Sequence, residues 1–343
     1  MENNLTLITG GAGFIGSNLA DNLLKNGQDV RILDNLSRPG TETNLEWLLK
    51  RYPNHLQFIK GDIRDFDLVK KATQDVQVIY HFASQVAVTH SVNDPRTDFE
   101  INALGTLNVL EGARLSGNQP IIGFTSTNKV YGGLEDLKID ELSDRYALRD
   151  FPEGISETRP LDFHSPYGCS KGAADQYVRD YFRIYQLPTF VFRMSCIYGT
   201  HQFGVEDQGW VAHFVISTVL NRPIKIYGSG KQVRDILWVG DLIQAFKLAT
   251  QKIDLTAGQI YNVGGGLANT ISIWIEFEKI LEGLIGNAIP ISYHDWRPGD
   301  QLIYVSDTTK ISQTLGWKPT INPPQGIEKL FRWVHDNKHL FQG

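Results

Sequence analysis

The sequence has little cysteine. Cys169 and Cys196 are the only two in 343 residues, and neither belongs to a C-x-x-C motif. Two separate cysteines cannot by themselves make a metal-binding set, so no metal site is expected. The scarcity also fits a reducing compartment, in which disulfides do not form, and we expect a cytoplasmic protein.

Long apolar runs and blocks of like charge are also missing. No run approaches the roughly 20 apolar residues needed to cross a bilayer. Residues 1–6 lead directly into a strand pattern, without the basic and apolar segments of a signal peptide. The chain carries 33 Lys and Arg against 38 Asp and Glu, a net charge of -5, with no basic cluster to bind phosphates. We therefore expect neither a membrane nor nucleic acid as a partner.

What the sequence does contain is a series of short apolar runs separated by helix-length segments. Runs of this kind predict parallel strands joined by crossover helices. The clearest are residues 5–9, 30–33, 56–59, 78–82, 121–125 and 189–192. We predict an α/β fold with a Rossmann-like doubly wound parallel sheet in residues 1–198, to which some later segments return. In residues 199–343, Gly and Pro clusters interrupt the pattern and predict a smaller C-terminal α/β substrate lobe.

The first strand pattern runs into Gly10-Gly11-Ala12-Gly13-Phe14-Ile15-Gly16, and residues 17–25 then follow a helical pattern. In a dinucleotide-binding loop, the first glycine makes the tight turn, the second lets the pyrophosphate approach and the third allows the helix to pack on the strand. The free N–H groups of the helix N-terminus face the phosphates. A structural turn is the alternative, but the flanking strand and helix favour a dinucleotide. The predicted contacts are Gly10, Gly13, Phe14, Ile15 and Gly16.

Asp34 closes the second strand pattern, 18 residues after Gly16. A carboxylate there can accept hydrogen bonds from both ribose hydroxyls and repels a 2′-phosphate, so Asp34 favours NAD over NADP. Arg38 is the opposing signal, because an arginine can pair with that phosphate, and Asp34 can also be an ordinary turn residue. Segments at or after strand ends supply the other cofactor candidates: Asn35, Ser37, Arg38, Asp62, Ile63, Ala83, Ser84, Gln85 and Thr125.

A further pair of candidates is Tyr167 and Lys171, which lie four residues apart and so on one face of a helix. An ammonium group beside a phenol favours the phenolate. Lys171 is therefore expected to lower the pKa of Tyr167 from about 10 and make it a general base. A solvated helix face is the alternative. The dinucleotide loop, and Thr127 at the end of the fifth strand pattern, favour catalysis.

These motifs resemble the extended short-chain dehydrogenase/reductase family over nearly the whole chain. The shared motifs occur in the family's order: the glycine loop, Thr127, Tyr167 with Lys171, Arg234-Asp235 and residues 297–300. The resemblance implies that Thr127 hydrogen-bonds the reacting oxygen and that Tyr167 is the acid/base. It also implies that Lys171 holds the nicotinamide ribose of NAD and that Asn102 supports the active site from a neighbouring helix.

The residues after Thr127 bear on the reaction. In this family, sugar-nucleotide 4,6-dehydratases carry Thr-Asp-Glu, because eliminating water needs an extra acid and an extra base, but this chain has Thr127-Asn128-Lys129. That segment, residues 161–177 and residues 207–211 resemble the subfamily of CDP-paratose (CDP-tyvelose) 2-epimerases. Cys196 stands where UDP-sugar 4-epimerases usually have asparagine, which fits a base other than uracil.

The resemblance also implies a set of substrate contacts, in which the two arginines bind the pyrophosphate. His164 can alternatively be a second acid/base, or a buried or ring-stacking histidine, and Trp210 can be a core residue. The implied contacts are Thr127, Asn128, His164, Cys196, Gln208, Trp210, Arg234 and Arg297.

We therefore predict an epimerase that keeps NAD tightly bound and recycles it. It inverts carbon 2 of a CDP-hexose, of the CDP-paratose/CDP-tyvelose or CDP-glucose/CDP-mannose type, through a transient keto sugar. The alternatives are a UDP-hexose 4-epimerase with the same catalytic residues and a dinucleotide-binding sensor without catalysis. Family members pair through two long helices, and residues 96–115 and 170–185 have apolar faces suited to a homodimer or homotetramer.

Overall fold

The chain folds into two compact units in a computed structural model that describes residues 5–296 and 300–342. The first unit consists of Met1–Val130, Phe163–Arg193 and Ile243–Tyr261. The second consists of Tyr131–Asp162, Met194–Leu242 and Asn262–Gly343. Residues 243–261 thus return to the first unit. Residues 131–162, which the sequence grouped with the first 198 residues, cluster with the second unit instead.

A seven-stranded sheet forms the centre of the first unit. Its strands are β1 (Leu5–Thr9), β2 (Asp29–Asp34), β3 (Leu56–Lys60), β4 (Val78–His81), β5 (Ile121–Thr127), β8 (Thr189–Met194) and β12 (Gln259–Val263). They follow the order β12-β8-β5-β4-β1-β2-β3, and β1 pairs in parallel with both β2 and β4. The strand order therefore reverses between β1 and β4, where doubly wound sheets bind ligands. The predicted fold class is confirmed.

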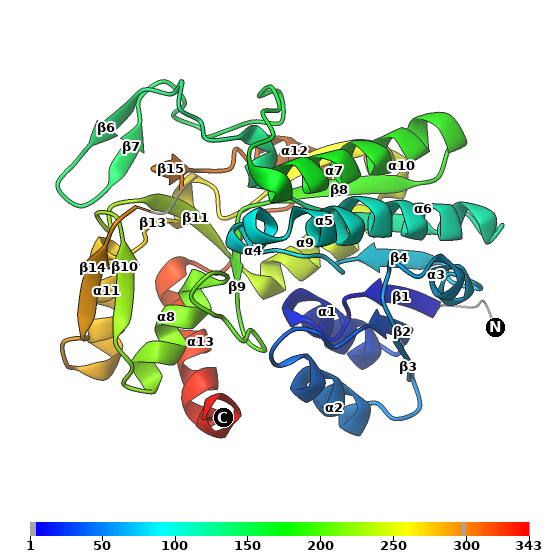
Figure 1. Cartoon of the computed structure of the whole chain (residues 1–343), viewed down its shortest axis with the longest axis horizontal. Helices are drawn as coiled ribbons and strands as arrows, with labels where there is room; N and C mark the ends of the chain where they lie inside the picture. The colour runs from blue at the N-terminus through cyan, green and yellow to red at the C-terminus, as the bar shows by residue number, and fades with distance from the viewer. Residues whose placement is uncertain (1–4, 297–299, 343) are drawn as a thin grey trace. The chain divides into compact units, whose positions relative to one another are not determined.

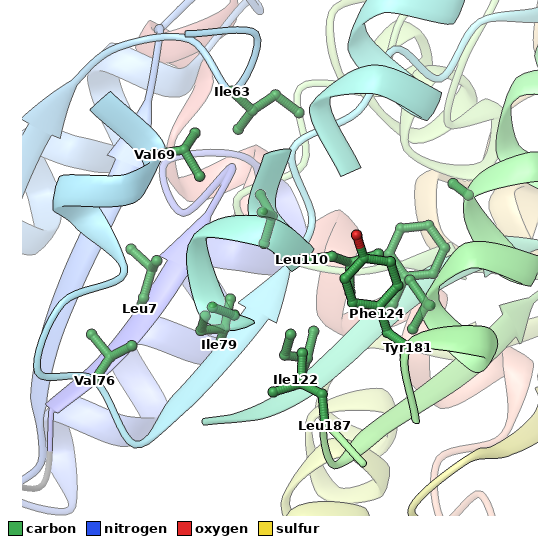
Figure 2. Close-up of a cluster of buried hydrophobic side chains, with 14 of the residues drawn as sticks. Leu7, Ile63, Val69, Val76, Ile79, Leu110, Ile122, Phe124, Tyr181 and Leu187 are labelled. Atoms are coloured by element: carbon green, nitrogen blue, oxygen red, sulfur yellow. The ribbon is translucent and has the colours of Figure 1, made fainter. Parts of the chain in front are cut away.

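One face of this sheet is covered by α3 (Phe66–Ala72), α6 (Gly105–Leu115) and α7 (Ser165–Tyr185). Side chains of a strand alternate between its two faces, so only every second residue points toward these helices. Figure 2 shows the resulting core, in which Leu7, Ile79 and Ile122 from the strands lie among Leu110 and Tyr181 from the helices. Figure 1 shows α6 and α7 running along the sheet.

Aromatic rings fill the opposite face. Tyr80, Phe190 and Phe192 surround Phe246 of α9 (Val239–Gln251), with ring centroids 5.6, 6.0 and 4.7 Å from it. A Cβ on Gly123 of β5 would lie 2.7 Å from the Phe190 ring, so this packing requires glycine there. The aromatic cluster explains why residues 243–261 belong to the first unit. The helices that follow β1 and β2 are α1 (Phe14–Lys25) and α2 (Thr41–Arg51).

The connection from β4 to β5 contains a π-helical turn. In order, it forms α4 (Val88–Asn93), α5 (Pro95–Phe99), the π-helical turn η1 (Glu100–Leu104) and α6. The Asp94 carboxylate caps α5 by accepting a hydrogen bond from Thr97 N at 3.1 Å. A π turn holds one residue more than an α turn and changes which side chains face inward. Here Asn102 is buried, whereas Phe99 and Leu104 are exposed.

The second unit is built from short strands and from helices packed around an aromatic core. Its strands include β6 (Ile139–Glu141), β7 (Tyr146–Leu148), β9 (Cys196–Tyr198), β10 (Ile224–Tyr227), β11 (Val233–Trp238), β13 (Thr270–Ser272), β14 (Ile291–His294) and β15 (Ile303–Tyr304). Its helices include α8 (Trp210–Val219), α11 (Ile275–Ile285), α12 (Thr309–Leu315) and α13 (Pro323–Asp336). Strand β11 pairs with β9, β13 and β15, and Trp274 and Phe277 are fully buried among the helices.

Within 5–296 and 300–342, no group of three or more His, Cys, Asp or Glu side chains is arranged to hold a metal ion. No helix in the same ranges is long and apolar enough to cross a membrane.

Candidate active site

The glycine segment lies between β1 and α1. Gly10 has a φ of +67°, and a Cβ there would lie 2.6 Å from the Ala83 nitrogen. A Cβ on Gly16 would lie 2.3 Å from the Gly10 carbonyl oxygen. Glycine is therefore required both for the turn and for the close packing of α1 on the loop. Gly13 precedes the first turn of α1, whose free N–H groups favour an anion. That turn begins with Phe14 and Ile15.

Asp34 is buried at the end of β2. Its Oδ2 accepts a hydrogen bond from Ala12 N at 3.0 Å, and its Oδ1 accepts one from Leu36 N at 2.8 Å. Burial raises the pKa of the Asp34 carboxyl, and the backbone N–H groups oppose that rise. The carboxylate thus joins the glycine loop to the end of β2, the position typical of a ribose contact.

Arg38 lies in the same loop and is half-buried. Burial lowers the pKa of its guanidinium group, and the negative charge of Tyr167 in its phenolate form opposes that change. Arg38 is therefore within electrostatic range of Tyr167.

Polar side chains also join the ends of β2 and β3. Asn35 Nδ2 donates to Asp62 Oδ2 at 3.0 Å, and Arg64 donates to both oxygens of Asp62. The hydrogen bonds from Arg64 hold the pKa of Asp62 at about 2. Ser37 is exposed, and its N–H donates to Asn35 Oδ1. The Ile63 side chain belongs to the hydrophobic core shown in Figure 2, so only its backbone could contact a cofactor.

A buried amide network follows β4. The Gln85 N–H donates to Asn102 Oδ1 at 2.9 Å, and Asn102 Nδ2 donates to Asp98 Oδ1 and to Ser170 Oγ, each at 3.1 Å. Asn102 therefore ties the loop after β4 to α7, the helix that carries Tyr167. The residues before Gln85 in this loop are Ala83 and Ser84, both half-buried.

Thr127, Tyr167 and Lys171 lie together in the first unit, and all three are buried. The Thr127 hydroxyl hydrogen-bonds the Tyr167 phenol. Lys171 follows one turn later on α7, where its Nζ donates to the Thr125 carbonyl at 2.7 Å and lies 4.3 Å from the centroid of the Phe124 ring. Strand β5 thus supplies a hydroxyl beside the phenol and both a carbonyl and an aromatic face for the ammonium.

The predicted effect of Lys171 on Tyr167 is wrong. Burial raises the pKa of Tyr167 to about 12, although the hydrogen bond with Thr127 acts against the rise. Burial likewise lowers the pKa of Lys171 to about 7, although Asp175 acts against the fall. Low dielectric surroundings disfavour both charged forms, and the sequence reasoning considered only the attraction between them.

Two buried carboxyl groups beside this pair were missed from the sequence. Asp175 lies one turn after Lys171 on α7 and accepts hydrogen bonds from Arg193 Nε and Nη2, each at 2.9 Å, in an ion pair that joins α7 to β8. Asp98 lies one turn before Asn102. The signal that points to both is spacing, because each stands four residues from a residue that was singled out.

The candidate substrate residues are divided between the units. Asn128 and His164 are in the first unit, where Asn128 Oδ1 accepts a hydrogen bond from Thr127 Oγ1 at 3.4 Å and the exposed His164 precedes α7. Arg297 lies outside the described residues. The others belong to the second unit: Cys196, Gln208, Trp210 and Arg234.

Within the second unit, Arg234 Nη2 donates to Asp300 Oδ1 and to the Gln301 carbonyl, each at 2.7 Å. The Trp210 ring packs edge-on against Phe214 and Phe277, so it forms part of the core. Of the remaining two, Cys196 pairs with Ile236 across β9 and β11, and Gln208 exchanges backbone hydrogen bonds with Val205.

The chain is similar to proteins that modify nucleotide sugars. The family described as GDP-mannose 4,6 dehydratase matches residues 7–330. The CDP-paratose 2-epimerase of Salmonella typhi is 43% identical over 337 residues, which are 96% of this chain and 98% of that protein. The UDP-glucose 4-epimerase of Mycolicibacterium smegmatis is 33% identical over 332 residues, 96% of this chain and 98% of that protein.

A solved structure gives a comparable match. The UDP-glucose 4-epimerase of Thermus thermophilus, in complex with NAD, has a TM-score of 0.80 and 31% sequence identity. The match covers 96% of this chain and 98% of that chain.

Proposed function

We propose that this chain, which belongs to the GDP-mannose 4,6 dehydratase family, is an NAD-dependent epimerase that inverts carbon 2 of a CDP-hexose. The family is one of enzymes that act on nucleotide sugars, and the chain's relatives are named epimerases and dehydratases. One observation carries the choice of epimerase: a phenol hydrogen-bonded to Thr127 beside a buried lysine, with no carboxylate at positions 128 and 129.

The residues of the first unit fit NAD. Gly10 and Gly16 leave no room for a side chain where the loop turns and meets α1, and the α1 N-terminus favours a pyrophosphate. Asp34 fits a ribose whose two hydroxyls are both free. NAD, when bound, accepts a hydride from the sugar and returns it in the same cycle, so an epimerase has no need to release it.

The chain's own residues handle the proton. Tyr167 takes the proton from the hydroxyl on sugar carbon 2 in its phenolate form, which burial disfavours and which the Thr127 hydrogen bond and Arg38 favour. Thr127 also holds the reacting oxygen by a hydrogen bond. Lys171 would hold the nicotinamide ribose, and the Thr125 carbonyl and the Phe124 ring position its ammonium group for that contact. When the resulting keto sugar is reduced on its opposite face, Tyr167 returns the proton and the centre is inverted.

Two arginines are the proposed anchor of the substrate. We assign the pyrophosphate to Arg234 and Arg297, because a planar guanidinium matches phosphate oxygens. An anchor at the pyrophosphate leaves the sugar free to turn between its two half-reactions. The sugar is of the CDP-paratose/CDP-tyvelose or CDP-glucose/CDP-mannose type.

Carbon 2 of a CDP-sugar is favoured over carbon 4 of a UDP-sugar by sequence similarity. The chain shares 43% identity with a CDP-paratose 2-epimerase and 33% with a UDP-glucose 4-epimerase over nearly the same length. Cys196 replaces the asparagine usual in UDP-sugar 4-epimerases. A sensor without catalysis is disfavoured because Tyr167 and Lys171 are both present and buried together.

An isotope experiment tests the proposal. The protein is incubated in ordinary water with CDP-hexoses deuterated at carbon 2, and with UDP-hexoses in parallel, and products are read by NMR. We expect inversion at carbon 2 of the CDP-sugar with the deuterium kept, since a hydride carried by a bound cofactor does not mix with water. Loss of the label to solvent would indicate proton abstraction instead. Inversion at carbon 4 would identify the protein as a 4-epimerase. If no sugar is converted, the dinucleotide-binding sensor without catalysis becomes the favoured function.

A further inference from the structure

Asp98 is a buried carboxylate in the active site that the mechanism above does not use. It lies on α5 with no exposed surface (0%). Its Oδ1 accepts a hydrogen bond from Asn102 Nδ2 at 3.1 Å, and its Oδ2 accepts one from Ser170 Oγ. Burial raises the pKa of this carboxyl, and the hydrogen bond from Ser170 and the Lys171 ammonium act against the rise. Because both oxygens act as acceptors, the network favours the ionised carboxylate.

This charge lies among the catalytic residues. Ser170, which holds one oxygen of Asp98, stands next to Lys171 on α7, and its hydroxyl also lies 3.2 Å from the Tyr167 carbonyl oxygen. Asp98 interacts electrostatically with both catalytic side chains. A buried carboxylate four residues before Asn102 is therefore a neighbour of the reacting centre as well as part of the support network.

Asp98 and Asp175 differ in how their charges are paired. Asp175 acts on Lys171 more strongly than Asp98 does, but its charge is also shared with Arg193 in an ion pair that is almost entirely buried. Asp98 belongs to no ion pair with an arginine, lysine or histidine in the part of the chain that the structure describes. The basic groups that face it are Lys171 and the exposed His90 of α4. The buried cation opposite Asp98 is thus the catalytic lysine.

We propose that Asp98 is a second countercharge of the active site, beside Asp175: it favours the ammonium form of Lys171 and shifts the pH range in which Lys171 and Tyr167 work together. Asp98 is a positioning residue, since it acts through Lys171 and Tyr167. The part of the proposal that concerns catalysis rests on the proposed epimerase function, whereas the part that concerns the charge of Lys171 does not.

The charges around Lys171 and Tyr167 determine the direction in which Asp98 shifts their pKa values. A negative charge stabilises the ammonium and destabilises the phenolate, so Asp98 raises the pKa of both groups. Burial opposes Asp98 at Lys171, and the buried His81 faces the same ammonium. Arg38 opposes Asp98 at Tyr167. Removing the charge of Asp98 should therefore move both titrations to lower pH.

The direct test is an NMR titration of the full chain with lysine labelled with carbon-13 at the ε position. The pKa of Lys171 is about 7, so its signal should titrate well below those of ordinary exposed lysines, near about 10.4. The signal is assigned by its loss in Lys171→Met. In Asp98→Asn we expect its midpoint to fall by roughly one pH unit, the lower end of what a nearby opposite charge contributes. Asp98→Ser, a smaller neutral residue, should give the same shift if Asp98→Asn folds poorly.

Asp94→Asn is the matched control. It removes the same charge from the residue that caps α5, and asparagine caps a helix as well as aspartate does. The Lys171 midpoint should stay at the parent value in this variant. An unchanged or raised midpoint in both Asp98 variants, or an equal fall in Asp94→Asn, overturns the proposal.

A second readout connects the charge to catalysis. With a substrate that the parent protein converts, the pH profile of kcat in Asp98→Asn should move as a whole to lower pH. A merely structural role would lower kcat without moving the profile, and that result would also overturn the proposal. If the parent converts no nucleotide sugar, the proposed function fails, while the NMR titration still decides the role of Asp98.

Discussion

Among single residues, Tyr167 offers the sharpest test of the chemistry. Replacing it with phenylalanine removes the hydroxyl that exchanges a proton with the sugar but keeps the buried ring. General acid/base catalysis typically contributes roughly 10²- to 10⁴-fold, so Tyr167→Phe should lower kcat by about that factor. Thr127→Val removes only the neighbouring hydrogen bond and should cost less. Turnover is measured beside dinucleotide binding, which both variants should keep. Near-parental turnover of Tyr167→Phe would remove Tyr167 from its proposed role.

The sequence could identify these residues but not their ionisation. Tyr167 and Lys171 followed from their spacing on a helix, and Thr127 from its place at a strand end. Their pKa values depend on burial by elements distant in sequence, such as β5 beneath the lysine, and no local pattern reports that burial. Asp98 was missed for the same reason, because in sequence it is one acidic residue among 38.

At the scale of secondary-structure elements, His81 joins three of them. Its Nδ1 lies 2.6 Å from Thr9 Oγ1 at the end of β1, and its Nε2 lies 2.9 Å from Thr106 Oγ1 on α6. Burial lowers the pKa of His81 to about 3, with Lys171 acting in the same direction. The imidazole therefore stays neutral in the folded protein over a pH range in which the unfolded chain binds a proton.

This difference predicts an acid-sensitive fold. Between about pH 6.5 and the folded pKa of about 3, the unfolded state binds the extra proton, so stability falls as pH falls, by up to roughly 1.4 kcal/mol per pH unit from this group. His81→Gln cannot take up that proton and should show a shallower loss, measured by urea unfolding at neutral and at acidic pH. His339→Gln, at an exposed histidine, is the control and should keep the parental slope. Equal slopes in parent and His81→Gln would contradict the prediction.

The elements were predicted best where their pattern is regular. All six predicted strands of the first 198 residues are strands of the sheet, because buried parallel strands give short apolar runs between helices. The seventh strand, β12, was not recognised individually, since it lies among the irregular segments of the second half. Residues 131–162 cluster with the second unit through contacts such as that of Tyr131 with Asn262, which are far apart in sequence and leave no local signal.

For the whole molecule, the exposed apolar side chains on α5, η1, α6 and α7 predict association. Monomeric proteins rarely expose many such residues together, and a symmetric pair of copies can bury them. They are Phe99, Leu104, Leu115, Tyr177, Ile184 and Tyr185. We therefore expect light scattering at micromolar concentration to give the mass of a dimer or of a tetramer built from dimers.

A charge placed on these helices should weaken the association. Ile184 is 64% exposed on α7, and Ile184→Glu would put a carboxylate into the buried interface, so the measured mass should fall toward that of one chain. Leu255 is similarly exposed (57%) but lies on α10 (Ile253–Thr256), and Leu255→Glu should leave the mass unchanged. A monomeric parent protein would refute the prediction.

The return of the chain to its first unit also bears on how the protein is made. A nascent chain that has left the ribosome only as far as residue 198 already contains the glycine loop, Tyr167 and Lys171. It still lacks β12, the neighbour of β8, and Phe246, the ring that packs against Phe190 and Phe192. Apolar surface therefore stays open until translation has passed through part of the second unit. Residues 1–198 are therefore not expected to fold as an independent domain when the chain is cut or fused at residue 198.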